Sequence, residues 1–323
     1  MIHAILLNPT VDVIYNIDNF HIGGTFKVEN MMRLPVGKAI SFAMGARELD
    51  DALGLNVLAL IGQEDIPSYS RFLKQKNINH KFIKIEGNTR SNKTILDTQN
   101  NTTTHIREQG FTVGSECEDK IKTLIEHQVK NEDICVFGGS IPPGLGDNIY
   151  YKLIKTAREQ NATCALDTSG APLIHGIECE PNIIKPNLVE LSQILKDNSL
   201  KHLTFSNFIE DAQKLVKRAK NLLNKGLKVI LISLGEKGAI LLNRDSAYFG
   251  HVQLEREIID TVGAGDSFLA GFIVPYSQGM TLKNCFKRAI ATGAASCLKM
   301  GPGILRKEDM DDLLHSVKTT KIY

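Results

Sequence analysis

Short apolar runs alternate along the chain with segments of helical period, which is the pattern of parallel strands joined by helices. The runs at residues 134–137, 164–166 and 229–232 are apolar throughout and predict buried strands. Between them, residues 149–157 and 212–223 place their apolar side chains on one helical face. The sequence therefore predicts an α/β protein with a mostly parallel sheet flanked by helices.

Two regions, residues 11–33 and 81–107, break this alternation. Polar residues interrupt β-branched ones there without a helical period, which predicts antiparallel strands that project from the main sheet. Ordinary edge hairpins are the alternative. Because no internal repeat or long linker divides the chain, we expect a single domain over residues 1–323, with a small β-sheet built from about 11–33 and 81–107.

Composition narrows the class of partner. The chain has 323 residues, 42% of them hydrophobic, so it can bury a large core. Its 38 basic and 36 acidic residues are nearly balanced, which gives no reason to expect nucleic acid or an anionic membrane. The six cysteines show no metal-like spacing and are expected to be buried free thiols. The first residues lack an export or anchor signal, so we expect a cytoplasmic protein.

The run D-T-V-G-A-G-D-S-F at residues 260–268 carries the clearest chemistry. Gly263 and Gly265 allow backbone N–H groups to turn toward one point, and a helix that begins near Asp266 adds its positive end. Asp266 would then be a general base beside an anion hole formed by the N–H groups of Ala264, Gly265 and Asp266. Such an aspartate is ionised at neutral pH without a raised pKa. The alternative is a turn in which Asp266 only caps the helix.

Seven further segments accompany this run in a recognisable order. They are N-P-T-V-D at 8–12, G-K at 37–38, T-R-S-N at 89–92, G-S-I-P-P-G at 139–144, D-T-S-G at 167–170, K-P-N-L-V-E at 185–190 and S-L-G-E-K-G at 233–238. Together they resemble the ribokinase-like carbohydrate kinases of the phosphofructokinase B type, over nearly the whole chain. The first, third and fourth segments are most similar to the kinases of phosphorylated hexoses, such as 1-phosphofructokinase and tagatose-6-phosphate kinase.

The resemblance implies a ribokinase-like fold in which the small β-sheet is a lid over the sugar site and the contact of a homodimer. It implies transfer of a phosphoryl group from ATP, with Mg²⁺, to a hydroxyl of a hexose monophosphate, giving a bisphosphate. Fructose 1-phosphate, tagatose 6-phosphate and fructose 6-phosphate are the expected acceptors. The alternatives are a kinase of an unphosphorylated sugar or nucleoside, and a sugar-phosphate sensor without catalysis.

On the nucleotide side, the resemblance puts Asn187 and Glu190 close to the phosphates and a hydrated Mg²⁺, with Lys185 nearby. Glu190 is the expected metal ligand, acting through water. The remaining nucleotide contacts are expected from small residues, namely Ser233, Gly235, Gly238 and Gly293. Simpler readings are a capping box between Asn187 and Glu190, and close helix packing at Gly293.

On the sugar side, Asp12 would bind hydroxyl groups of the substrate, and Ser140 would contact the substrate from across the cleft. A substrate phosphate needs cationic partners, and the candidates are Arg90, Lys38 and Lys27. Arg90 is favoured because T-R-x-N matches the phosphosugar branch and because a guanidinium offers bidentate geometry. A solvated surface cation is the alternative for each of the three. The remaining predicted substrate contacts are Gly37, Ser41 and Asn92.

The sugar loop departs from the family pattern P-G-G-K-G-x-N. Val36 and Ala39 replace glycines, and Ser41 replaces an amide. His105 and Arg107 stand where relatives usually have an asparagine-containing strand. They are expected to be exposed lid residues, and contact with a different substrate is the alternative. Other nucleotide-binding classes are excluded, because no P-loop motif occurs and no G-x-G-x-x-G follows the first strand.

Overall fold

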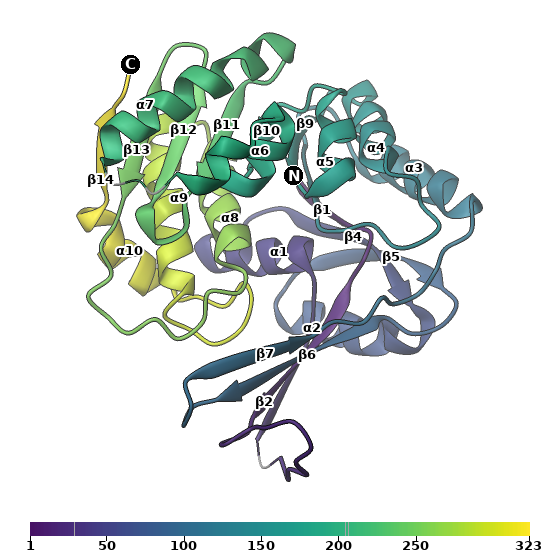
Figure 1. The fold of residues 1–323 in the computed structure, drawn as a ribbon. Helices are drawn as coiled ribbons and strands as arrows, with labels where there is room; N and C mark the ends of the chain where they lie inside the picture. Colours follow the sequence, from purple (N-terminus) through teal and green to yellow (C-terminus); the bar gives the residue numbers. More distant parts are fainter. Residues whose placement is uncertain (29, 204, 206) are drawn as a thin grey trace.

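A ten-stranded sheet runs through the body of the protein (Figure 1). The computed structural model describes residues 1–28, 30–203, 205 and 207–323. In spatial order the strands are β14 (Lys318–Lys321), β13 (Ala247–His251), β12 (Ala239–Asn243), β11 (Val229–Ser233), β10 (Ile183–Ile184), β9 (Thr163–Asp167), β8 (Ile134–Gly138), β1 (Ile2–Leu6), β4 (Leu55–Gly62) and β5 (Asn79–Ile85). The strands from β11 to β5 pair in parallel, and β12, β13 and β14 are antiparallel additions at one edge.

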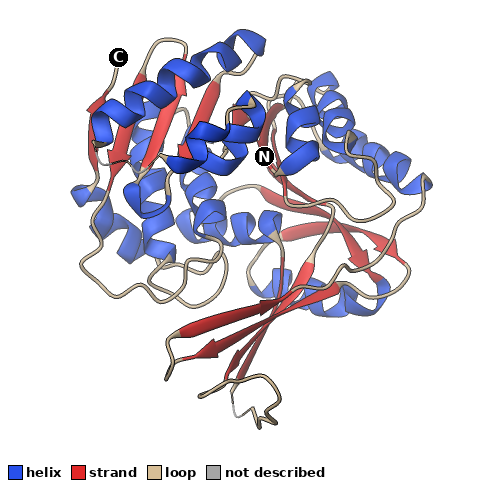
Figure 2. Ribbon diagram, in the orientation of Figure 1, coloured by secondary structure: helices blue, strands red, loops and turns tan. Residues whose placement is uncertain are grey.

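Helices cover both faces of this sheet (Figure 2). One face carries α3 (Glu116–Gln128), α4 (Ile149–Glu159), α5 (Gly170–Ile177), α6 (Leu188–Leu195) and α7 (Phe208–Ala219). The other face carries α1 (Lys38–Leu49), α2 (Ile66–Gln75), α8 (Ala264–Ser277), α9 (Leu282–Ser296) and α10 (Lys307–Ser316). Successive residues of the central strands point into opposite layers, as with Ile5 in one core and Leu6 in the other.

The predicted strands and helices are confirmed, with one difference in length. Residues 134–137, 164–166 and 229–232 lie in β8, β9 and β11, and the apolar face at 149–157 is the buried face of α4. The second predicted helix, at 212–223, ends as α7 at Ala219. Leu222 and Leu223 continue in a 3-10 turn, where both side chains stay buried.

A second sheet of four strands stands apart from the body (Figures 1 and 2), and we call it the small sheet. Its order is β3 (Met31–Val36), β2 (Thr10–Asn16), β6 (Arg90–Asp97) and β7 (Thr102–Ile106). β3 and β7 pair antiparallel with their neighbours, whereas β2 and β6 pair in parallel, so the expectation of antiparallel strands alone was wrong.

The predicted boundary of the small sheet was also wrong at residues 81–85. These residues belong to β5, which pairs in parallel with β4 in the large sheet. β5 is the edge strand, so its side chains are less buried than those of the central strands. An edge strand and a projecting strand therefore share the same mixed polar pattern, and the sequence alone did not separate them.

Two further expectations concern the whole chain. All six cysteines are free, and five of them are buried, as predicted. Within the described residues, no helix combines the length and the apolar composition needed to cross a membrane.

Candidate active site

Polar residues from five predicted segments meet at one edge of the large sheet. Asn8 follows β1, Ser140 follows β8, Asp167 ends β9, Lys185 follows β10 and Ser233 ends β11. These strands are parallel neighbours, so their carboxyl ends lie along one edge. That edge is where open α/β sheets bind ligands.

Helix α8 places Asp266 at this edge in its first turn. The helix begins at Ala264, and Gly263 is its cap residue with φ of +80°. A Cβ atom on residue 263 would lie 2.7 Å from Cα of Pro302, so only glycine fits both the conformation and the space. The cap position belongs to Gly263 and Asp266 lies inside the first turn, so the alternative in which Asp266 caps the helix was wrong.

The first turn of α8 leaves two backbone donors at the proposed anion hole. The N–H of Ala264 donates to the carbonyl of Thr261 at 3.2 Å, so this predicted donor is already used. The N–H groups of Gly265 and Asp266 lie in the first turn, where a helix offers them no carbonyl partner. The anion hole predicted from the sequence is therefore smaller by one donor.

Asp167 joins the two lysines of the site. Its Oδ1 lies 2.9 Å from Nζ of Lys38 and 3.2 Å from Nζ of Lys185. Burial opposes ionisation of Asp167, but the two ammonium groups hold its pKa below the ordinary value. Burial also opposes protonation of Lys38, yet the carboxylates of Asp167 and Asp266 raise its pKa. Asp167 was in a matching segment but was not assigned a role, although a carboxylate ending a buried strand signals the sheet edge.

Lys185 also reaches the N-terminal turn of α8. A Cβ atom on residue 265 would lie 3.2 Å from Nζ of Lys185, so Gly265 makes room for the ammonium group. Lys185 is 5% exposed and Asp167 is 3% exposed. Two lysines, the free N–H groups and the positive end of α8 therefore face one region, which suits a phosphoryl group.

The ionisation of Asp266 differs from the expectation. Asp266 is 7% exposed, and burial raises its pKa from 3.8 to about 7. Lys38 and Lys185 oppose this shift, and the negative charge of Asp167 adds to it. The carboxyl therefore changes its protonation state near neutral pH, which is the range for a general base.

The nucleotide-side residues form a capping box at α6. Asn187 accepts a hydrogen bond from the N–H of Glu190, and Glu190 accepts one from the N–H of Asn187, both at 2.9 Å. The N–H of Ser233 donates to the carbonyl of Pro186 at 3.0 Å, which keeps β11 against this segment. The structural alternative for Asn187 and Glu190 is therefore confirmed, and nucleotide contact remains a prediction.

The predicted glycines next to this segment have backbone reasons for being glycine. Gly235 and Gly238 have φ of +63° and +106°. A Cβ atom on residue 293 would lie 3.1 Å from Cβ of Phe268, so Gly293 allows α9 to pack closely on α8. Close packing, the alternative for Gly293, is thus confirmed.

On the small sheet, Asp12 lies in a hydrogen-bonded cluster. Its Oδ1 accepts bonds from the Thr10 hydroxyl at 3.0 Å and from the Asn92 amide at 3.2 Å. Burial raises the pKa of Asp12, while these bonds and the charges of Arg107 and Arg90 oppose the shift. Asp12 and Asn92, both predicted substrate residues, are therefore neighbours.

Arg90 is held at the junction between the small sheet and the body. Its Nε donates to the carbonyl of Pro9 at 3.1 Å, and its Nη2 donates to the carbonyl of Asn8 at 3.1 Å. Nη2 also lies 3.3 Å from Oγ of Ser140, which in turn accepts a bond from the Asn8 amide at 3.1 Å. The guanidinium is thus fixed beside two predicted sugar residues, Asp12 and Ser140.

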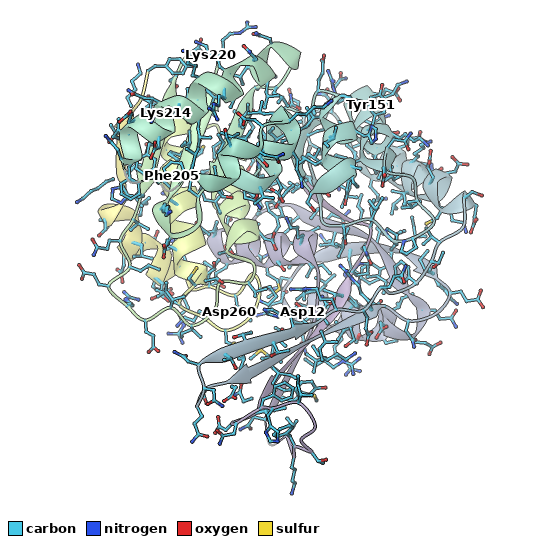
Figure 3. The ribbon with its side chains drawn as sticks, in the orientation of Figure 1. Asp12, Tyr151, Phe205, Lys214, Lys220 and Asp260 are labelled. Carbon is cyan, nitrogen blue, oxygen red and sulfur yellow. The ribbon has the colours of Figure 1, made fainter. Side chains whose placement is uncertain are left out.

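A cavity of about 270 Å³ separates the small sheet from the body. Asp12, Thr94 and His105 line it from the small sheet, and Asp260, Thr261 and Met300 line it from the body. Figure 3 shows Asp12 and Asp260 in this region. Asp260 holds the facing loop in place by accepting bonds from the N–H groups of Val262 and Gly301, at 2.9 and 3.0 Å.

Three other predicted substrate residues lie in different surroundings. Gly37 caps α1 with φ of +138°, against Leu6. Ser41 is 1% exposed, and its backbone packs under Gly303. Lys27 is exposed in the loop between β2 and β3, at the far end of the small sheet from Arg90, so the chain does not bring these two cations together.

The altered sugar loop carries no backbone strain. Val36 ends β3 and Ala39 lies in α1, and neither has a positive φ. The glycines expected at these positions are therefore not required by the backbone.

Comparison with known proteins gives one consistent result. The model of the pfkB family of carbohydrate kinases matches residues 10–309. A 1-phosphofructokinase from Bacillus subtilis is 28% identical over 324 residues, covering 100% of both chains. A tagatose-6-phosphate kinase from Staphylococcus epidermidis is 26% identical over 326 residues, again covering 100% of both.

Solved structures show the same fold. Phosphofructokinase-2 from Escherichia coli, in complex with fructose-6-phosphate, has a TM-score of 0.85 at 20% identity, covering 97% of this chain and 98% of that one. Ribokinase from Thermotoga maritima has a TM-score of 0.74 at 20% identity, covering 98% and 99%. The predicted ribokinase-like α/β fold is confirmed.

Proposed function

The chain belongs to the pfkB family of carbohydrate kinases, and we propose that it phosphorylates a hydroxyl group of a hexose monophosphate, using ATP and Mg²⁺. The observation that carries this proposal is the convergence at one sheet edge of Asp266, the Lys38–Asp167–Lys185 cluster and the first turn of α8. A base, two cations and free backbone donors are what phosphoryl transfer needs.

The acceptor class rests on Arg90 and on the relatives. Arg90 is fixed by backbone carbonyls next to Ser140 and Asp12, so a guanidinium is already oriented where the acceptor would bind. A guanidinium binds phosphate through two hydrogen bonds. The relatives from Bacillus subtilis and Staphylococcus epidermidis are named for phosphorylated acceptors, which supports fructose 1-phosphate or tagatose 6-phosphate, with fructose 6-phosphate next.

In the proposed reaction, Asp266 accepts the proton of the attacking hydroxyl. The hydroxyl oxygen forms a bond to the transferred phosphorus, and the bond from that phosphorus to the leaving oxygen of ADP breaks. The N–H groups of Gly265 and Asp266, with Lys38 and Lys185, stabilise the negative charge of the transferred group. Loss of a base of this kind lowers the rate by roughly two to four powers of ten.

The residues present fit a hydrated magnesium ion. Glu190 uses Oε2 in the capping box, which leaves its other oxygen for a water of the ion. Among the described residues, no cluster of three or more acidic, histidine or cysteine side chains could hold a metal directly. Magnesium keeps several waters and binds nucleotide phosphates, and when bound it neutralises their charge. Glu190 is therefore the proposed contact, through water.

A homodimer through the small sheet is proposed as well. The sheet projects from the body and exposes apolar side chains, with Met31 at 59% and Ile106 at 51%. Light scattering coupled to size-exclusion chromatography tests this, with Ile106→Asp as the variant. A dimer mass that becomes a monomer mass in the variant supports the proposal, and a wild-type monomer contradicts it.

ADP release tests the function most directly. The wild-type protein would be supplied with Mg·ATP and a panel of free hexoses, hexose monophosphates and nucleosides, beside Asp266→Asn. Turnover of a hexose monophosphate, lost in the variant and on addition of EDTA, would support the proposal. Turnover of free sugars or nucleosides alone would overturn the acceptor class, and tight sugar-phosphate binding without turnover would favour a sensor.

A further inference from the structure

Arg107 is a cation of the small sheet that the fold brings to the acceptor site. Lys93 of β6 pairs with Ile106 of β7, so Arg107 follows one step beyond the ladder, opposite Asn92. Alternate residues of a strand share a face, which puts Arg107 on the side of His105. His105 and Thr94, its cross-strand partner, line the cavity between the small sheet and the body.

The segment that follows β7 is fixed along β6. Glu108 accepts a hydrogen bond from the N–H of Ser91 at 2.7 Å and pairs with the ammonium group of Lys93. Gly110 lies against Arg90, since a Cβ atom on residue 110 would be 2.9 Å from Cβ of Arg90. The backbone that follows Arg107 is therefore fixed close to Arg90, by the contacts of Glu108 with β6 and of Gly110 with Arg90.

The charges around Arg107 favour an anion. Burial lowers the pKa of Arg90, and the positive charge of Arg107 lowers it further. Asp12 is the nearby carboxylate for both, and burial raises its own pKa. Within the described chain, Arg107 has no ion pair or hydrogen bond of its side chain. Two like charges beside one carboxylate leave an unmatched positive charge.

We infer that Arg107 is a specificity-determining residue, which supplies a second guanidinium and, with Arg90, clamps the phosphate of the acceptor. This inference rests on the proposed function and extends it to a residue that the sequence favoured as an exposed position. A phosphate monoester carries nearly two negative charges at neutral pH and accepts several charge-assisted hydrogen bonds. Two arginines fixed on neighbouring strands meet both requirements.

A buried oxygen of Asn92 lacks a hydrogen-bond donor among the described residues, which is consistent with an Arg107 side chain that moves. Oδ1 of Asn92 is buried and has no hydrogen-bond partner among the described residues. Arg107 lies opposite this residue, so its guanidinium can donate to that oxygen once a bound phosphate draws it inward.

The test compares acceptor and nucleotide kinetics in Arg107→Ala, Arg107→Lys and wild type. Charge-assisted hydrogen bonds are worth about 1.5–3 kcal/mol, which corresponds to a rise of roughly 10- to 100-fold in the acceptor KM. The kcat and the KM for ATP should change less than about threefold, and Arg107→Lys should recover part of the loss because it keeps the charge. Arg244→Ala is the matched control, because Arg244 is exposed in the β12–β13 turn at the opposite edge of the large sheet.

The outcomes separate the inference from the proposed function. Wild-type turnover of a hexose monophosphate with an unchanged acceptor KM in Arg107→Ala overturns the inference alone. A loss confined to kcat, or a loss equal to that of Arg244→Ala, overturns it as well. Failure of the wild type to phosphorylate any hexose monophosphate overturns the proposed function, and the inference with it.

Discussion

Neutralising Asp266 should make the folded protein more stable while it removes the activity. Asp266 is 7% exposed, and among the described residues its carboxylate accepts no hydrogen bond. The buried negative charge of ionised Asp266 therefore destabilises the folded state, and Asp266→Asn removes that charge. The expected result is a stabilised protein whose kcat is lower by roughly two to four powers of ten.

The magnitude follows from the two pKa values of the carboxyl group. The pKa is about 7 in the folded state, against an ordinary value of 3.8. Between these values the folded state binds more protons than the unfolded state, so stability falls as the pH rises and then stays low above pH 7. With 1.36 kcal/mol for each pKa unit, the penalty is between about 1 and 2 kcal/mol at pH 5 and about 4 kcal/mol at pH 8.

Urea unfolding of wild type and Asp266→Asn at pH 5 and pH 8 measures this difference. The gain in free energy of unfolding should be roughly 2 to 3 kcal/mol larger at pH 8, and any change common to both pH values cancels. Asp97→Asn is the control. Hydrogen bonds, that of Asn100 first, lower the pKa of Asp97 below 3.8, so its contribution is complete at both pH values and its loss should be the same.

A gain for Asp266→Asn that is equal at pH 5 and pH 8 would refute the reasoning, because it would mean that burial does not strain the ionised carboxylate. A smaller gain at pH 8 would refute it more strongly. Stabilisation with retained activity would leave the electrostatics intact but would remove Asp266 from its role as base.

Three other predictions follow from the same structure. The kcat/KM for the acceptor should fall about tenfold for each pH unit below about 7. In Asp167→Asn this fall should begin at a lower pH, because the charge of Asp167 raises the pKa of Asp266. Plots of kcat/KM against pH that coincide for wild type and Asp167→Asn would contradict this. In urea unfolding, Gly263→Ala should lower the free energy of unfolding by roughly 2 kcal/mol more than Gly279→Ala. Both residues have φ near +80°, but only Gly263 lacks space for a Cβ atom, which would meet Pro302. Equal losses would show that the contact with Pro302 relaxes. Burial lowers the pKa of His3, so wild type should lose stability relative to His3→Gln as the pH falls below about 6.5, and parallel curves between pH 7.5 and 5 would contradict that assignment.

The order of elements and the edge that carries the site could be predicted because both are local properties. Each apolar strand runs directly into a polar segment, and parallel strands bring their carboxyl ends together. The capping box of Asn187 and Glu190 could also be predicted, because residues three apart at the start of a helix lie close together within its first turn.

Relations between distant residues could not be predicted. The pKa of Asp266 depends on burial and on Lys38 and Asp167, which are far from it in the sequence. Lys27 was grouped with Arg90 by charge alone, whereas the strand register places it at the other end of the small sheet. The polar pattern of residues 81–85 suited an edge strand in either sheet.

The position of β1 in the large sheet has a consequence for how the protein is made. β1 leaves the ribosome before the other strands of this sheet, yet it lies between β4 and β8. Its partner on one side, β8, begins at Ile134, about 130 residues later. At 5–20 residues per second, the ribosome needs roughly 6 to 25 seconds to supply that strand.

During this interval the nascent chain holds an apolar parallel strand with one open edge, and open edges of this kind pair readily with other chains. Asn8, which ties the end of β1 to Ser140 beyond β8, cannot make this bond before then. The sheet edge that carries the candidate active site is therefore completed late in synthesis, and truncated chains that stop before β8 should be clients of chaperones rather than partly active enzymes.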